Sequence, residues 1–382
     1  MGKFSNIDGL KDISVIGFAN ILGSGISGLF WIYLAALLGA ENYGELSYYI
    51  SISGIATSLA FIGGPHAITV LVAKKIKIES TIYFTSIISS IIVALVLYFS
   101  FSNIGISVYV IGAVLYNLSA SELLGRKFYT KYSIYFILQK ILFVVLSLGL
   151  YYVIGPEGVL IGVGLSFLPF FHRIYRGFKN TPLNFRLLKT KSKFLINNFL
   201  LDLSYILDAQ ADKLIIGPIF GFTILGNYYF AVQILHLLAI FPEIVKKYTI
   251  PEDSSGKNTL KIKIITILFS VVLALVGIFI VPKIIPIFLP EYSTALELIP
   301  IISISIIPTS IATLLSSNFL AQEKSGFLVI TSLSSVAILI IGIFSLGTIF
   351  GVVGLAYSLV ISDISRVLML LFFMRTKNVG NL

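Results

Sequence analysis

Long apolar stretches recur from one end of the chain to the other, and they constrain its fold more than any other feature. A helix needs about 20 apolar residues to cross the hydrocarbon core of a bilayer. By that length the sequence predicts about twelve spans, at residues 13–38, 46–73, 80–101, 104–124, 132–153, 157–176, 195–219, 223–246, 262–288, 294–320, 327–348 and 352–374. Charged residues make up only 12% of the 382, whereas soluble domains carry about 25%. We therefore predict an all-α, polytopic transmembrane helix bundle.

The charges of the connections provide an independent test of this count. Lys and Arg gather at both ends of the chain and in every second connection, most densely near residues 177–194. The alternate connections carry mainly glutamates, and the charged residues near them are Glu41, Glu45, Glu157, Glu291 and a single cation, Lys283. An odd number of spans would destroy this alternation. By the positive-inside rule, both termini and the 177–194 connection are expected in the cytoplasm.

The net charge of +10 is compatible with a nucleic-acid partner, but cytoplasmic loop charges account for it, so no nucleic acid is expected. Cysteine is absent, which excludes disulfides and thiolate metal sites. His66, His172 and His236 lie in three different predicted spans without the spacing of a metal site, and we expect hydrogen-bonded side chains there. His66 follows a Gly-Gly-Pro sequence that predicts a kink. Neither a metal nor a cofactor is predicted.

The predicted spans form two sets of six, and the longest polar connection divides the chain into lobes at residues 1–182 and 183–382. Glycines recur at matching places in the two halves: Gly39 and Gly44 match Gly221 and Gly226, and Gly155 and Gly158 match Gly351 and Gly354. These glycines indicate a repeat, although glycines also end helices at short turns in unrelated segments. An even number of spans per half makes the repeat parallel. Two such lobes with short outer loops indicate a transporter that works by alternating access.

Ionisable side chains inside spans cost at least about 2.5 kcal/mol each at the helix centre, so each is a candidate functional residue. The seventh span carries most of them in one stripe, at about 100° per residue, which should face a cavity or the other lobe rather than lipid: Asn198, Asp202, Tyr205, Asp208, Asp212 and Lys213. Asn20 is the nearest polar equivalent in the first half. Because Asp212 and Lys213 are neighbours in sequence, we expect their side chains to diverge and not to neutralise each other.

Two other spans contain charges. Lys140 lies beside Gln139 in the fifth span, and Asp363 and Arg366 are three residues apart on one face of the twelfth. Asp363 and Arg366 can form a local ion pair, or either can face the transport pathway. Lys140 and Lys213 can likewise extend toward the membrane surface or contact a substrate. These alternatives remain open at the level of sequence.

Several short segments together resemble a known family. They are Asn20, Leu38-Gly39, Tyr43-Gly44 and Leu46-Ser47 in the first half, and Ala211-Asp212-Lys213, Gly217, Gly221, Leu225-Gly226, Tyr228, Ala231, Pro286, Pro290-Glu291-Tyr292, Gly351, Gly354 and Ala356 in the second. In order and spacing the chain resembles polysaccharide flippases of the Wzx type, in the MOP superfamily that also holds the MATE drug exporters. The resemblance covers nearly the whole chain, with shortened loops.

The resemblance implies movement of a lipid-linked oligosaccharide from the cytoplasmic to the outer leaflet of the plasma membrane, by a monomeric transporter that is not an enzyme. Membrane lipids and the lipid-linked glycan are its expected partners, with proteins of glycan assembly as further candidates. An anionic pyrophosphate headgroup implies a cationic cavity, for which Lys140, Lys213 and Arg366 are the candidate ligands. The candidate cavity-lining or ion-coupling residues are Asp202, Asp208, Asp212, Asp363, Asn20 and Asn198.

Two other functions are considered. A MATE-type antiporter that exports small molecules in exchange for cations is the main alternative, because the carboxylates of the seventh span could bind a proton or a sodium ion. A membrane-embedded glycosyltransferase or polymerase is disfavoured, because every predicted outer loop is only a few residues long and no phosphate-binding Gly-rich loop is visible.

Overall fold

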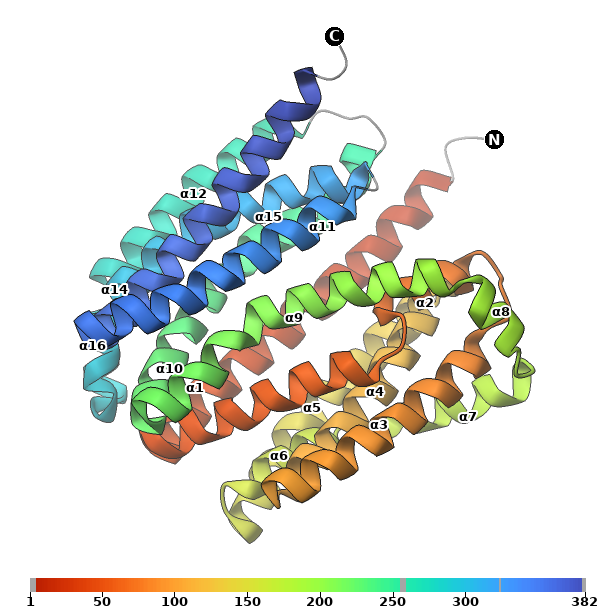
Figure 1. Cartoon of the computed structure of the whole chain (residues 1–382), viewed down its shortest axis with the longest axis horizontal. Coiled ribbons are helices and arrows are strands. Elements are labelled where there is room, and N and C mark those ends of the chain that lie inside the picture. The colour runs from red at the N-terminus through yellow and green to blue at the C-terminus, as the bar shows by residue number, and fades with distance from the viewer. Residues whose placement is uncertain (1–4, 255–258, 323, 380–382) are drawn as a thin grey trace. The chain divides into compact units, whose positions relative to one another are not determined.

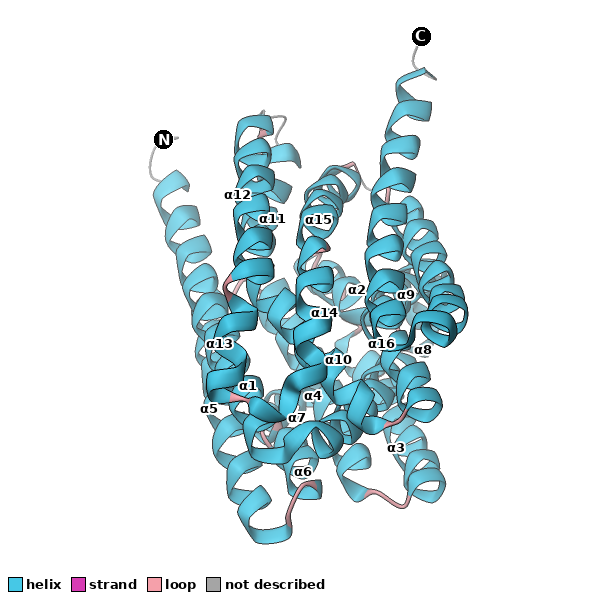
Figure 2. Cartoon of the chain, turned by 90° about the vertical axis from the view of Figure 1, so that its left-hand side faces the viewer, coloured by secondary structure: helices cyan, strands magenta, loops and turns pink. Residues whose placement is uncertain are grey.

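In a computed structural model, residues 5–254, 259–322 and 324–379 are described, and within these ranges the chain consists of helices and short connections without a strand (Figure 2). Contacts divide the chain into two compact units. Unit 1 comprises residues 1–30 and 49–206, and unit 2 comprises residues 31–48 and 207–382. Two of the three chain boundaries between the units fall inside α1 (Ser5–Ala60), and the third falls inside α9 (Ser192–Phe220). The division into two lobes at residues 182 and 183 stays a prediction.

Unit 1 contains most of the first half of the chain (Figure 1). Its helices are the flanks of α1 (Ser5–Ala60), then α2 (Gly64–Ala73), α3 (Glu79–Phe101), α4 (Ile104–Gly125), α5 (Tyr129–Ile154), α6 (Glu157–Leu165), the 3-10 helix η1 (Leu168–Phe170), α7 (Phe171–Asn180), α8 (Phe185–Thr190) and the start of α9. Helix α4 packs against α2, α3 and α6, and most of its residues are buried. The short break before α4 is a true helix boundary, because the Asn103 side chain accepts hydrogen bonds from the backbone N–H groups of Gly105 and Ile106.

Unit 2 contains the middle of α1 and most of the second half of the chain. Its further helices are the end of α9, then α10 (Phe222–Leu238), α11 (Ile240–Ser254), α12 (Leu260–Phe279), α13 (Val281–Phe288), the 3-10 helix η2 (Pro290–Tyr292), α14 (Ser293–Ile304), α15 (Ile306–Ala321) and α16 (Ser325–Val379). The core is rich in aromatic side chains, and the Tyr292 hydroxyl donates a hydrogen bond to the Ala35 carbonyl oxygen at 3.0 Å.

The predicted number of spans is confirmed. By length and composition, seven helices of the described chain can cross a membrane, or nine when two bent pairs each count as one span. Helices α1 and α16 count once each, although Gly39 and Gly351 divide each of them into two segments. With these two divided and the charged α9 included, the described chain holds twelve crossing segments. The protein is therefore an all-α multi-pass membrane protein. The predicted kink before His66 is present, where Gly63 and Gly64 both have positive φ.

The glycines that mark the repeat share an unusual backbone conformation. Their φ and ψ angles are 70° and 171° at Gly39, 93° and 157° at Gly221, 78° and −158° at Gly155, and 58° and −137° at Gly351. Residues that carry a Cβ atom essentially never adopt these combinations of φ and ψ. Each matched pair therefore makes the same glycine-dependent turn between consecutive spans, as an internal repeat predicts.

The second glycine of each motif lies at a close helix contact that also follows the repeat. A Cβ atom on Gly44 would lie 1.9 Å from the Phe222 carbonyl oxygen, and one on Gly226 would lie 1.8 Å from the Ala40 carbonyl oxygen. The two contacts are reciprocal, since each glycine meets the backbone four residues before its counterpart. This crossing joins the middle of α1 to α10, and it explains why residues 31–48 belong to unit 2.

Candidate functional site

The polar stripe of α9 is divided between the two units. At its start, in unit 1, the Ser58 hydroxyl donates a hydrogen bond of 2.8 Å to the Asp202 carboxylate. The Asn198 side chain donates to the Phe194 carbonyl oxygen of its own helix, and Asn20 does the same to Ile16, each at 2.8 Å. These three residues are held by local hydrogen bonds within unit 1. Whether they line a transport pathway stays a prediction.

The middle of the stripe, in unit 2, forms an ion pair with the last span. The Arg366 guanidinium contacts the Asp208 carboxylate directly, and its Nη2 and Nε atoms donate to the Ser335 hydroxyl at 3.1 and 3.2 Å. The Asp363 carboxylate lies 4.0 Å from the same guanidinium. The pair of Arg366 with Asp363, which the sequence allowed, is thus weaker than the pair with Asp208. The reason is that a direct hydrogen bond to Asp208 holds the guanidinium in place. Two carboxylates share one arginine, which leaves an excess negative charge.

The Asp363 carboxylate also accepts a hydrogen bond from the Thr309 hydroxyl at 3.3 Å. Asp363 is buried. An ionised carboxylate in such surroundings is costly unless a cation or a proton compensates it. This part of unit 2 is therefore the described region that best fits a bound cation or an exchangeable proton.

The end of the stripe contradicts one expectation. Lys213 Nζ lies 2.9 Å from an Asp212 carboxylate oxygen and also donates to the Ala209 carbonyl oxygen at 2.5 Å, so the two neighbours do neutralise each other. The other carboxylate oxygen accepts a 2.9 Å hydrogen bond from the Tyr228 hydroxyl. The angle of 100° per residue describes where side chains leave the helix, but the four-carbon stem of lysine is long enough to fold back toward the preceding turn. With exposures of 3% and 2%, Asp212 and Lys213 form a buried, neutral pair.

Lys140 differs from the other two candidate cations. It lies inside α5, and its Nζ stands over the rings of Phe136 and Phe143, at 5.4 and 5.7 Å from their centroids. Among the described residues it has no carboxylate partner within ion-pair distance. The neighbouring Gln139 is buried and donates to the Ser166 hydroxyl at 2.9 Å. A cation held over aromatic faces retains its charge for an anionic ligand, since the rings do not neutralise it.

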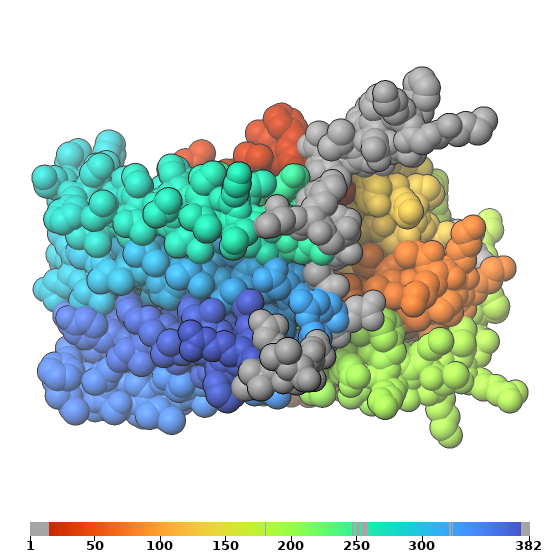
Figure 3. Space-filling model, turned by 90° about the horizontal axis from the view of Figure 1, so that it is seen from above, coloured from red at the N-terminus to blue at the C-terminus, as the bar shows by residue number. Residues whose placement is uncertain are grey.

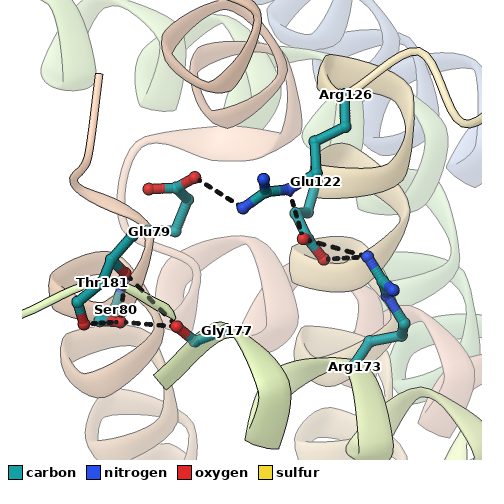
Figure 4. Close-up of polar contacts among 7 residues, drawn as sticks. All are labelled: Glu79, Ser80, Glu122, Arg126, Arg173, Gly177 and Thr181. Atoms are coloured by element: carbon teal, nitrogen blue, oxygen red, sulfur yellow. Dashed lines mark hydrogen bonds and ion pairs between the residues drawn. The ribbon is translucent and has the colours of Figure 1, made fainter. Parts of the chain in front are cut away.

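Sequence reasoning missed a second charged cluster, at the ends of α3, α4 and α7 in unit 1 (Figure 4). Glu122 is its centre and receives Arg126 Nε at 2.6 Å and Arg173 Nη2 at 3.1 Å, while Arg126 also reaches Glu79 at 3.1 Å. The four charges sum to zero. The only sequence signal was the four-residue spacing of Glu122 and Arg126, because Glu79 and Arg173 come from distant segments.

Unit 2 has a smaller polar cluster at matching ends of its spans. Lys263, at the start of α12, reaches Asp253 at 2.6 Å and the Asn318 side chain at 2.5 Å. Burial raises the pKa of Asp253, but hydrogen bonds from Lys263, Thr259 and Ser317 lower it more, so its pKa lies below the ordinary range. The histidines contribute to no metal cluster, since no group of three or more potential metal ligands occurs in the described ranges.

Several solved structures of membrane transporters have the same fold as this chain. The chain is similar to the lipid II flippase MurJ in an inward closed conformation, with a TM-score of 0.72 and 15% identity over 94% of this chain and 87% of that one. It is also similar to an inward-facing multidrug-resistance MATE transporter of the MOP superfamily, with a TM-score of 0.70 and 15% identity over 94% and 95% of the two chains.

A third similar structure is a MOP-superfamily transporter from Pyrococcus furiosus, for which a reversed polarity of the binding pocket suggests a different function. Its TM-score is 0.59, with 14% identity over 96% of this chain and 95% of that one. No protein-family model matches the sequence. No curated protein matches it either. The chain therefore has the fold of MOP-superfamily transporters. At sequence identities this low, the similarity shows a shared fold alone.

Proposed function

We propose that this protein moves a lipid-linked oligosaccharide with an anionic headgroup from the cytoplasmic to the outer leaflet of the plasma membrane. The fold supports transport by alternating access, and the similar structures include both a lipid flippase and drug transporters. The observation that carries the choice is Lys140, a cation inside a membrane span with no acidic partner in the described chain. Lys213 and Arg366, in contrast, are neutralised and act mainly in structure.

The proposal gives Lys140 a specific role. A phosphate that leaves water needs a compensating charge, and an ammonium group over two rings provides it without first breaking an ion pair. Substitution of Lys140 by Ala should therefore reduce export of the glycan at least tenfold, and Arg should rescue better than Gln. Lys131→Ala is the matched control, because Lys131 lies on the same helix over the Phe128 ring but is exposed at the helix end.

The test is glycan export in cells that express each variant at equal levels in place of the wild type. Deletion of the gene should leave lipid-linked glycan trapped on the cytoplasmic leaflet. Normal surface glycan in the deletion strain, without a redundant transporter, would count against the function itself. Full activity of Lys140→Ala would remove the role of Lys140 and leave the function open.

The orientation in the membrane belongs to the same proposal. Because the basic connections are assigned to the cytoplasm, a cysteine introduced at Thr190 should not react with an impermeant reagent added to intact cells. The native chain has no cysteine, so the labelling has no background. Labelling from outside the cell would show that the topology is opposite to the one proposed.

Cation-coupled export of a small molecule is the second candidate, and the Asp208–Arg366–Asp363 cluster favours it. Its excess negative charge could be compensated by a sodium ion or a proton. In proteoliposomes, Asp363→Asn should then abolish dependence on an ion gradient while the fold is retained. Transport that depends on neither gradient would exclude coupling. A drug substrate that crosses while lipid-linked glycan does not would favour the antiporter over the flippase.

A further inference from the structure

A long segment of unit 1 carries cations without any acidic residue. From residue 158 to residue 201 the sequence contains no Asp or Glu, yet it contains Arg173, Arg176, Lys179, Arg186, Lys189, Lys191 and Lys193. Arg173 is neutralised by Glu122. The other six have no ion-pair partner among the described residues, and all but Lys191, which is half-buried, are exposed. The positive-inside rule accounts for cations on this side of the membrane, and their concentration here without any acidic residue also creates a local surface of positive charge.

This segment, residues 171–193, is anchored rather than loosely attached. The Ser80 hydroxyl donates to the Thr181 carbonyl oxygen at 2.7 Å and contacts the Gly177 carbonyl oxygen at 3.1 Å (Figure 4). The Thr81 hydroxyl accepts a hydrogen bond of 2.7 Å from the backbone N–H of Asn184. These contacts attach the connection between α7 and α8 to the start of α3, and they hold its exposed side chains in a defined arrangement.

Aromatic and aliphatic side chains accompany the cations. Phe178 packs against Tyr83 and Phe185 against Phe84, with ring centroids 6.0 and 6.1 Å apart. Leu183 and Phe185 nevertheless remain 49% and 51% exposed, although they follow a membrane span directly. Figure 3 shows the segment, in lime green, at the surface with side chains that project from this face. Exposed apolar groups beside cations are typical of a segment that lies in the headgroup region of a bilayer.

We propose that the segment 171–193 is a binding surface for the phosphate headgroups of anionic phospholipids in the cytoplasmic leaflet. The six unpaired cations supply charge complementarity, and the apolar side chains enter the boundary of the acyl chains. Leu187 and Leu188 pack against the core of unit 1, which directs the basic side chains of α8 outward. The surface would tether the connection that precedes α9 to one leaflet. This inference is independent of what the protein transports.

The experiment uses the full chain with one fluorophore on a cysteine introduced at Thr190, which is exposed in the basic segment. In vesicles, brominated phosphatidylglycerol should quench the fluorescence of this label more strongly than brominated phosphatidylcholine does at the same mole fraction. Each basic residue near a bilayer contributes to such attraction, so removal of four should abolish most of the preference at low salt. The variant is Lys179→Gln, Arg186→Gln, Lys189→Gln and Lys193→Gln combined.

The matched control removes four other exposed cations of unit 1, by substitution of Lys74, Lys77, Lys127 and Lys131 with Gln. It should keep the preference, and so should a variant in which Lys and Arg are exchanged at the four test positions. Equal quenching by the two lipids in the wild-type protein would overturn the proposal. An equal loss in test and control variants would also overturn it, since net charge alone would then explain the effect. Binding of a soluble RNA to the segment without any lipid preference would assign it to another partner.

Discussion

The two units differ in where they keep their charges. In unit 1 the ionised network of Glu79, Glu122, Arg126 and Arg173 joins the ends of three helices. In unit 2 the carboxylates of α9 and α16 form their pairs inside the membrane-crossing segments. Charges at helix ends can stabilise a unit while water remains near, whereas charges within a span are costly and are kept for a function. The first set therefore joins helix ends of unit 1, whereas the second set joins residues within and between the spans of unit 2.

The largest expected effect is on the stability of unit 1. Glu122 is 4% exposed and is shared by two arginines, so Glu122→Ala leaves the buried Arg173 without a carboxylate, whereas Arg126 keeps Glu79. We expect a loss of about 3–5 kcal/mol in the free energy of unfolding, measured by denaturation of the purified protein in detergent. Glu41→Ala, at an exposed position, is the control and should change stability by less than about 0.5 kcal/mol. A small effect at Glu122 would mean that the network does not stabilise unit 1.

The next effect tests what the two halves share. Gly226→Ala places a methyl group against the backbone of α1, which cannot move as a side chain can, and should cost about 1–3 kcal/mol or more. Gly44→Ala should cost a similar amount, because its contact is the reciprocal one. Gly149→Ala is the control, since no atom lies within 4 Å of its added Cβ. Thermal unfolding measures all three. If Gly44→Ala and Gly226→Ala differed greatly in their loss of stability, the two reciprocal contacts would not be energetically equivalent.

A smaller effect sharpens the assignment of unit 2. Asp208→Asn removes the direct partner of Arg366 but leaves Asp363 beside it, so we expect a loss of about 1–3 kcal/mol. Asp363→Asn should cost less, because the excess negative charge disappears. The double variant should cost more than the sum of the two, since the guanidinium then has no carboxylate. Simple additivity in unfolding measurements would argue against a shared arginine.

The smallest effect is a dependence on pH. Because the pKa of Asp253 is lower in the folded protein than in the unfolded chain, its contribution is present at neutral pH and is lost as the pH falls through the folded value. In the wild type, stability should therefore decrease below about pH 4 by about 1 kcal/mol from this residue. Asp253→Asn should be less stable at pH 7, and its stability should decrease less than that of the wild type as the pH is lowered. An unchanged pH profile would contradict the role of Asp253.

Much of this architecture could be predicted from particular residues. The apolar stretches predicted about twelve spans, and Gly39, Gly155, Gly221 and Gly351 marked the turns that connect them. The candidate site was less accessible. The sequence identified the charges of α9, but it separated Lys213 from Asp212, left the Asp363–Arg366 pair open and did not reveal Asp208 as the direct partner of Arg366. Reasoning along one helix is insufficient here, because long side chains reach other turns and other helices.

The sequence alone indicated that the chain lies in a bilayer and where its spans are connected. Bilayer thickness sets the span length, and the turns at Gly39, Gly155, Gly221 and Gly351 combine positive φ with extended ψ, which favours glycine. Only the tertiary structure decided which charges are neutralised. Asp208 and Arg366 are 158 residues apart, and Glu79 and Arg126 are 47 apart, so no local pattern reveals these pairs. The packing of helices brings such side chains together. It also leaves Lys140, among the cations considered for the substrate, beside aromatic rings without an acidic partner in the described chain.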